Sequence, residues 1–227
     1  MAIRENYLKI KENIAEACRR AKRDPETVQV LAVCKEQAED QVSRAIECGI
    51  RLFGENRVQE AELHINRFRD AGLNWHFIGR LQKNKINRIL NLFQLIESVD
   101  GVKNLEHIQK RTDSPLAVFL EVNVGNEPSK AGFTIEGLKK ALPYIANLRN
   151  IKITGLLAIP PFFDNPEKAR PFFRKLRELG AEINRAELAN INIENLSMGM
   201  SADYEVAVEE GATIVRLGTA LFGRRRP

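Results

Sequence analysis

The sequence has little of what metal sites, disulfide frameworks and membrane spans require. Its 227 residues include three cysteines and three histidines, with no C-x-x-C pair. These numbers argue against a disulfide framework and against a zinc site. No apolar run reaches about 18 residues, and the charged N-terminal stretch lacks the apolar block of a secretory signal. We therefore predict a cytoplasmic protein with reduced thiols, no bound metal and no membrane partner.

Charge of one sign is not concentrated along the chain. The net charge is +5, but 30 acidic residues are interspersed among 35 basic ones. This mixture does not indicate an extended nucleic-acid surface. The one basic cluster, Arg224–Arg226, is interpreted as a solvated end rather than a nucleic-acid patch. We expect no nucleic-acid partner.

Linkers are also absent, since no Gly/Ser-rich, Pro-rich or low-complexity segment divides the sequence. Residues 1–227 are therefore expected to form a single domain. What recurs is a β-branched apolar run followed by an amphipathic helical pattern. The expected strands are Val28–Cys34, Arg51–Gly54, Trp75–Gly79, Leu95–Val99, Leu116–Val122, Ile153–Ile159, Ile193–Met198 and Thr213–Leu217.

Helical periodicity fills the gaps between these runs. One apolar face follows the second run (Val58, Ala61, Ile65, Phe68), and another follows the fifth (Ile135, Leu138, Leu142, Ile145). Thr134 is the expected N-cap of the second of these helices, and Pro143 weakens it locally. An extra helix precedes the first strand, with its expected apolar side formed by Leu8, Ile10, Ile14, Ala17, Cys18 and Ala21.

Strands that alternate with helices imply parallel pairing, because each crossover helix returns the chain in the same direction. Apolar runs such as Leu116–Val122 are typical of strands buried on both faces. Eight units predict an α/β fold, a single (β/α)8 TIM barrel with an extra N-terminal helix. A doubly wound open sheet is the alternative, although no G-x-G-x-x-G follows the first strand.

Chemistry in such barrels gathers at the C-terminal ends of the strands. Lys35 follows the apolar run VLAVC without a polar spacer, so its amine is expected to project into the barrel mouth. A partly desolvated lysine there can act as a nucleophile toward aldehydes. The alternative is a lysine that extends along the strand end to keep its charge in water.

Two later segments together predict a phosphate site. Ser197–Ser201 is a glycine turn with a hydroxyl before an expected helix, Ala202–Glu210. Free backbone N–H groups and the helix dipole there favour an anion, although Ser201 could act only as an N-cap. After the last strand, Gly218 allows close backbone approach and Thr219 offers a hydroxyl. Loops after strands seven and eight often bind phosphate in barrels.

Other polar residues lie in or after the strands. Arg216 could point inward, where its permanent charge would keep a pyridine nitrogen unprotonated, or it could form a buried ion pair. Asn56 could bind a ring hydroxyl or serve as a turn residue or helix cap. His76 is interpreted as a hydrogen-bonded structural histidine, and Cys34 as a packing residue. Aromatic residues expected in the core or under the helices are Trp75, Phe162, Phe163, Phe172 and Phe173.

These residues lie within segments that match a known family. The chain resembles the pyridoxal phosphate (PLP) homeostasis proteins, small barrels related to the N-terminal domain of alanine racemase. The matching segments are FGENRVQE (Phe53–Glu60), WHFIGRLQKNK (Trp75–Lys85), SVD (Ser98–Asp100), EVNVGNEPSKAGF (Glu121–Phe133), LSMGMSADYEVA (Leu196–Ala207) and VRLGTALFG (Val215–Gly223). Several long motifs in the correct order are more specific than any single one.

The resemblance implies a PLP barrel of fold type III, monomeric or weakly associating, with the cofactor held as an aldimine on Lys35. It also implies that Ser201, Gly218 and Thr219 hold the phosphate, with Arg216 near the pyridine nitrogen. The full expected cofactor-binding set is Lys35, Asn56, His76, Met200, Ser201, Arg216, Gly218 and Thr219. The implied function is PLP (vitamin B6) and amino-acid homeostasis, with no catalytic residues assigned. Because we expect no second domain to cover the cofactor, PLP should be exchangeable, and PLP-dependent apo-enzymes are the candidate recipients.

The chain departs from this family on both sides of the lysine. The family usually has serine before it and threonine after it, whereas this chain has Cys34 and Glu36. Because Lys35 itself is present, we expect binding to persist. The additional carboxylate of Glu36 could change how readily PLP is released.

Two enzymatic alternatives stay open. A PLP-dependent racemase needs acid–base groups on both faces of the ring. Alanine racemase takes one of these, a tyrosine, from a second domain that we expect this chain to lack. Tyr7, Tyr144 and Tyr204 all fall in expected helices. An aldolase that acts on a sugar phosphate through a lysine imine is the other alternative, although such aldolases place their lysine later in the barrel. We expect racemase activity to be absent or residual.

Overall fold

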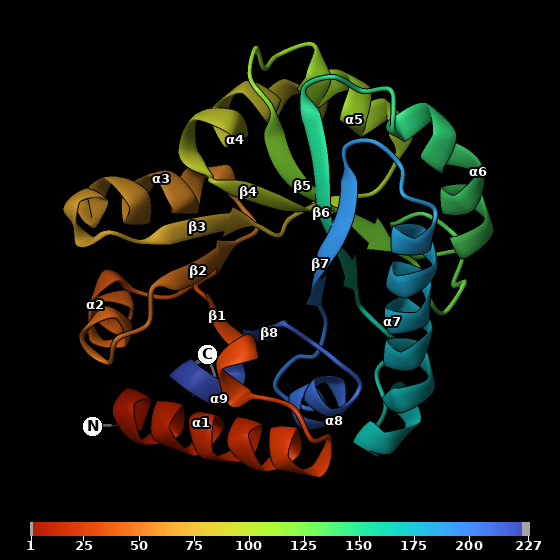
Figure 1. Cartoon of the computed structure of the whole chain (residues 1–227). Coiled ribbons are helices and arrows are strands. Elements are labelled where there is room, and N and C mark those ends of the chain that lie inside the picture. Colours follow the sequence, from red (N-terminus) through yellow and green to blue (C-terminus); the bar gives the residue numbers. More distant parts are fainter. Residues whose placement is uncertain (1, 224–227) are drawn as a thin grey trace.

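The computed structural model describes residues 2–223, so the predicted solvated end at Arg224–Arg226 lies outside the described residues. The eight predicted strands are present as one closed parallel barrel in chain order (Figure 1). Strand β1 pairs with both β2 and β8, which confirms the barrel and excludes the open-sheet alternative. The strands are β1 (Gln29–Val33), β2 (Leu52–Glu55), β3 (Asn74–Phe77), β4 (Leu95–Val99), β5 (Leu116–Val122), β6 (Ile151–Ala158), β7 (Ile191–Ser197) and β8 (Ile214–Leu217).

A helix follows each strand and covers the outside of the barrel. The α-helices are α1 (Ala2–Arg20), α2 (Glu39–Glu47), α3 (Val58–Arg67), α4 (Ile86–Leu92), α5 (Val102–Gln109), α6 (Ile135–Ile145), α7 (Arg170–Arg185), α8 (Tyr204–Glu209) and α9 (Thr219–Phe222). Short 3-10 turns are Pro25–Thr27, Arg69–Ala71, Lys83–Lys85 and Pro166–Ala169. Helix α6 begins as predicted, because the Thr134 hydroxyl accepts the Gly137 N–H at 3.0 Å.

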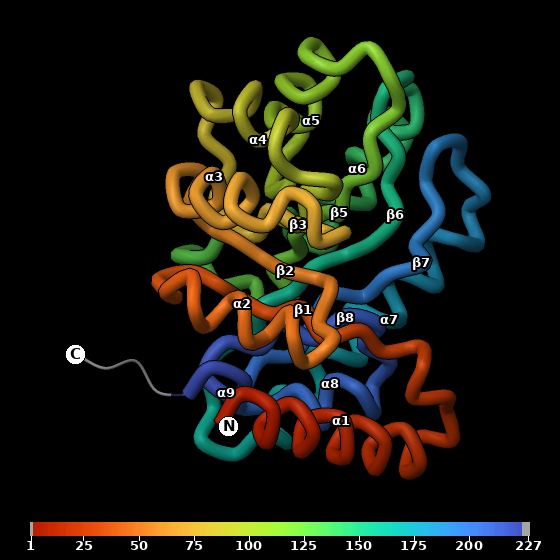
Figure 2. Tube along the Cα trace, turned by 90° about the vertical axis from the view of Figure 1, so that its left-hand side faces the viewer, coloured from red at the N-terminus to blue at the C-terminus, as the bar shows by residue number. Residues whose placement is uncertain are grey.

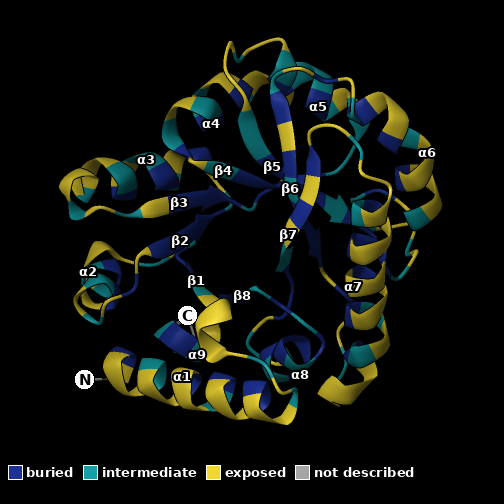
Figure 3. Ribbon diagram, in the orientation of Figure 1, coloured by how far each residue is buried: buried dark blue, intermediate teal, exposed yellow. Residues whose placement is uncertain are grey.

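Residue alternation along each strand divides the core into two parts, since successive side chains point to opposite faces. On β1, Leu31 and Val33 point into a small cluster inside the barrel, whereas Ala32 and Cys34 face the helix layer. Figure 3 shows the mostly buried strands inside a ring of helices whose outer faces are exposed. Gly54 leaves room for the Leu31 side chain inside the barrel, because a Cβ at residue 54 would lie 2.3 Å from Leu31 Cδ2.

The extra N-terminal helix is present as α1 and packs beside α8 and α9 at the end of the chain (Figure 2). Asn13 donates to the Tyr204 hydroxyl at 2.8 Å, and Asn6 donates to the Leu221 carbonyl at 2.9 Å. Since α9 has only four residues, α1 covers part of the barrel that the last helix leaves open. The predicted apolar side is wrong at Leu8, which is 60% exposed, because Ile3 occupies the packed face instead.

Three arginines of α7 converge on the carboxylate that follows α8. Glu210 is buried and lies 3.2 Å from Arg170, 3.0 Å from Arg174 and 3.2 Å from Arg177. Burial alone would raise the pKa of Glu210, but the arginine hydrogen bonds outweigh it and hold that pKa below its usual value. The cluster therefore links two consecutive helices of the outer ring.

We expect acid to weaken this link and Glu210→Gln to remove that part of the pH dependence. Because the folded-state pKa is depressed, the stabilisation is present above the unfolded-state pKa of about 4.3 and is lost as pH falls through the folded-state pKa. At neutral pH the substitution should cost about 1.5–3 kcal/mol of unfolding free energy. Urea unfolding across the acid range measures this, with the exposed Glu194→Gln as control. Parallel pH profiles for wild type and Glu210→Gln would contradict the prediction.

Candidate functional site

A cavity of about 490 Å³ lies at the C-terminal ends of the strands. Its walls come from the segments that follow β1, β2, β3, β6, β7 and β8. The structure brings seven of the eight predicted cofactor residues to this one cavity: Lys35, Asn56, Met200, Ser201, Arg216, Gly218 and Thr219. They come from four different loops or strands, so the cavity forms only when the barrel closes.

Lys35 reaches the cavity because it continues the inward-facing series of β1. Leu31 and Val33 face the barrel interior, and the next residue of that series is Lys35. Its neighbour Cys34 faces the opposite way and is fully buried. Burial, together with the nearby Glu55 charge, raises the pKa of the Cys34 thiol well above its usual value. A thiol held protonated in this way is a packing group, as predicted, rather than a reactive one.

The loop after β7 and the start of α9 meet at one side of the cavity. The Ser201 hydroxyl accepts the Ala220 N–H at 3.0 Å, which joins the two segments. The predicted helix Ala202–Glu210 begins later, at Tyr204, and Ser201 is not its N-cap. Asp203 instead occupies that position and accepts the Met200 N–H at 2.6 Å. Across residues 2–223, no hydrogen bond donated by the Ser201 N–H is found, so it can still bind an anion.

Arg216 lies on β8 with its guanidinium inside the barrel, 4% exposed. It donates to the Ser197 hydroxyl at 2.8 Å and to the Ala158 carbonyl at 2.9 Å. Burial lowers the pKa of Arg216, and the Glu97, Glu121 and Asp203 charges oppose that effect. An arginine remains charged even so, and these contacts fix where its charge meets the cavity.

His76 is the predicted residue that does not line the cavity. Its Nδ1 lies 2.6 Å from Glu97 Oε1, and Glu97 Oε2 accepts the Ser197 hydroxyl at 2.5 Å. Together with Arg216 these groups form a buried polar chain across the barrel interior, beside the cavity. This arrangement agrees with the interpretation of His76 as a hydrogen-bonded structural residue.

Asn56 contributes an unused acceptor. Its Oδ1 is buried and has no hydrogen-bond partner among the described residues. Gly79 packs on the Asn56 backbone so closely that a Cβ there would lie 2.1 Å from the Asn56 carbonyl oxygen. An unpaired buried acceptor costs free energy of about 1–3 kcal/mol. A ligand that donates a hydrogen bond at this point would recover that cost.

Sequence reasoning missed several lining residues, including Gln37, Arg80, Ile159 and Phe162. Phe162 was expected in the core, but it is 81% exposed, so that expectation is wrong. It lies in the loop after β6, where Phe163 instead stacks on Phe172 at 5.8 Å between ring centroids. Position just beyond a strand end was the available signal, because such loops form the barrel mouth.

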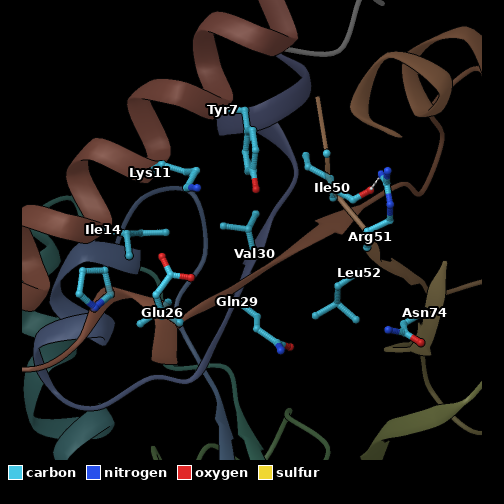
Figure 4. A pocket seen from close by; sticks show the side chains of 13 residues that line it. Tyr7, Lys11, Ile14, Glu26, Gln29, Val30, Ile50, Arg51, Leu52 and Asn74 are labelled. Carbon is cyan, nitrogen blue, oxygen red and sulfur yellow. Dashed lines mark hydrogen bonds between the residues drawn. The ribbon is translucent and has the colours of Figure 1, made fainter. Parts of the chain in front are cut away.

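A second cavity of about 360 Å³ lies at the opposite end of the barrel, under α1. Figure 4 shows Tyr7 and Lys11 of α1 facing the beginnings of the first strands, with Arg51 and Asn74 across the space. No predicted cofactor residue lines it, and its charged side chains are exposed to water. Between residues 2 and 223, no group of three or more His, Cys, Asp or Glu side chains could hold a metal ion.

The fold and its cavity are those of a PLP-type barrel, and the family model for "Alanine racemase, N-terminal domain" matches residues 6–226. A pyridoxal phosphate homeostasis protein of Aquifex aeolicus is 44% identical, covering 98% of each chain. The structure of PipY from Synechococcus elongatus with PLP bound has a TM-score of 0.82 and 34% identity, covering 94% of this chain and all of that one. The chain belongs to the pyridoxal phosphate homeostasis protein family.

Alanine racemase of Clostridium difficile is similar in fold alone, with a TM-score of 0.69 and 15% identity. This chain is covered completely in that match, but only 56% of the racemase is. Over residues 2–223, no helix combines the length and the apolar character that crossing a membrane requires.

Proposed function

We propose that this chain binds PLP in the cavity at the strand ends and serves to maintain the supply of that cofactor. The observation that carries the proposal is the convergence of seven predicted residues on one cavity, among them Lys35 and the unpartnered Asn56 Oδ1. PipY, a family member, has been solved with PLP bound, which supports the same cofactor here.

Each lining group suits one part of PLP. The Lys35 amine condenses with the aldehyde carbon, so that a C=N bond forms and water leaves. The Ser201 N–H, with Gly218 and Thr219 on the same side of the cavity, suits the phosphate. Arg216 suits an unprotonated pyridine nitrogen as a fixed donor, and Asn56 Oδ1 accepts from the ring hydroxyl. Met200 borders the phosphate side, and His76 acts indirectly through the buried polar chain.

We propose no dedicated catalytic reaction for this site. Its titratable lining residues are Lys35, Arg80 and Arg216, and none of the described tyrosines, histidines or carboxylates lines it. Racemisation needs a second acid–base group opposite the lysine, and an arginine is too weak an acid to fill that role readily. This lining therefore favours a protein that binds and releases PLP over a PLP-dependent racemase.

Further parts of the proposal concern the chain in the cell. We propose a cytoplasmic, monomeric protein in which residues 1–227 form one domain. We also propose that PLP-dependent apo-enzymes receive the cofactor from it. Phe162 and Met200 line the cavity and are exposed, which supports the proposal that a recipient protein can approach it.

The proposal is tested by adding PLP to the purified protein, reducing with borohydride and mapping the modified peptide. We expect a violet-region absorbance band before reduction and a stable adduct on Lys35 after it. Pyridoxal, which lacks the phosphate, is the control and should label Lys35 much more slowly at the same concentration. Absence of both the band and the adduct would overturn PLP binding.

A further inference from the structure

The segment Phe53–Glu60 contributes Asn56 to the cavity, but its two glutamates lie elsewhere. Glu55 is the last residue of β2 and points away from the barrel interior, and Glu60 lies on α3. Both lie close to the short loop between β1 and α2 that carries Lys35. This loop therefore has partners outside the cofactor cavity.

The loop has a backbone conformation that its sequence does not favour. Glu36, directly after Lys35, has φ +61, which is in the left-handed region. Non-glycine residues adopt this region rarely and at a cost in free energy. The Gln37 N–H bonds back to the Cys34 carbonyl at 2.9 Å and closes a tight turn around Lys35. The direction of the lysine depends on that turn.

A side chain of α3 contacts this turn. Glu60 Oε2 accepts the Glu36 N–H at 2.9 Å, while Glu60 Oε1 lies 3.0 Å from Arg57 Nη1. One turn later, the His64 ring is buried, and its Nδ1 lies 2.8 Å from Glu55 Oε1. The ring also stacks near Trp75 at 6.3 Å. Residues 60 and 64 are one turn apart and therefore share a helix face.

We propose that Glu60 is a positioning residue, which holds the Lys35 turn so that the lysine amine points into the cavity. This inference rests on the proposed role of Lys35. Glu60 accepts the N–H of Glu36, which is the residue after the lysine and has a left-handed backbone conformation.

Packing of α3 does not by itself explain these contacts. Val58, Ala61 and His64 supply the buried face of the helix, whereas Glu60 remains partly exposed. An acceptor oxygen is not required there for burial, but it is required to accept the Glu36 N–H. Residue 36, where this chain has glutamate and the family usually has threonine, is also the residue whose backbone Glu60 supports.

Glu60→Ala should loosen the turn before any cofactor is added. We expect backbone hydrogen exchange of residues 35–38 in the cofactor-free protein to be about tenfold faster, the order expected for one lost hydrogen bond to a charged group. With PLP added, the borohydride-trapped adduct on Lys35 should form several-fold more slowly. Glu60→Gln, which keeps an acceptor oxygen, should restore most of both values.

Two further variants separate positioning from a general loss of structure. Arg57→Ala removes the partner of Glu60 but leaves the acceptor, so it should behave as wild type. Glu36→Gly in the Glu60→Ala background should recover much of the labelling rate, because glycine adopts positive φ readily. Unchanged exchange and labelling in Glu60→Ala would overturn the inference. Failure of wild type to label at Lys35 would instead overturn the proposed function, and the exchange result would still decide whether α3 holds the turn.

Discussion

Lys35→Ala is expected to abolish the covalent adduct with PLP and the absorbance band that accompanies it. Lys35 is the one lysine among the residues that line the described cavity. The remaining lining groups can hold phosphate and ring only by reversible contacts, so PLP should be lost on gel filtration. Absorbance and mass spectrometry after borohydride treatment measure the result.

Lys35→Arg is the matched control, because it keeps the positive charge but replaces the amine by a guanidinium. A guanidinium stays protonated and does not condense with an aldehyde under these conditions. Both variants should keep the wild-type unfolding temperature closely, since Lys35 is only partly buried. Persistence of a reducible adduct at full stoichiometry in Lys35→Ala would assign the cofactor to another residue and contradict the proposed site.

Glu97→Leu is expected to lower the free energy of unfolding by about 3–5 kcal/mol, the order expected when one charge is removed from a buried set of opposite charges. Glu97 is fully buried on β4 and accepts from both His76 and Ser197. Through Ser197 its charge offsets that of buried Arg216. Without Glu97, the buried guanidinium of Arg216 loses the carboxylate that reaches it through Ser197, and only the Glu121 and Asp203 charges still offset it. Urea unfolding at neutral pH measures the loss.

The double variant Glu97→Leu with Arg216→Met identifies the cause. If the unpaired charge dominates, removing Arg216 as well should recover much of the lost stability, because apolar replacement of a whole buried pair is often neutral. Glu194→Gln, on the exposed face of β7, is the control and should change stability by less than about 0.5 kcal/mol. A loss below about 1 kcal/mol in Glu97→Leu would contradict a charge-balancing role.

The predicted strands match the structure closely, and the reason is local. Leu95–Val99 and Leu116–Val122 were predicted with their observed bounds, and the other strands differ by two residues or fewer at each end. Strands buried on both faces are continuous apolar runs bounded by polar segments, so their bounds can be read from composition. The start of α6 was predicted correctly, whereas α8 begins at Tyr204 rather than Ala202 and its N-cap position is Asp203.

Errors at single positions have a common origin in long-range packing. Leu8 fits the apolar stripe of α1 by periodicity, but the neighbouring α8 and α9 pack against the side that carries Ile3 and Ile10. Phe162 is a large apolar residue of the kind usually found in a core, yet it projects from a loop at the cavity mouth. Periodicity describes one element, and it cannot show which part of the surface a distant segment covers.

The sequence by itself determined the order of strands and helices, and it also placed Lys35 at the mouth of a barrel. Both follow from local rules, because helix and strand periods are properties of short segments and a period of two fixes which strand residues face inward. Only the tertiary structure decided that Ser197, Glu97 and Arg216 meet inside the barrel, and that α3 supports the turn after Lys35. Ser197 and Glu97 are 100 residues apart in sequence. Their contact exists only because the eight strands close, which no single segment encodes.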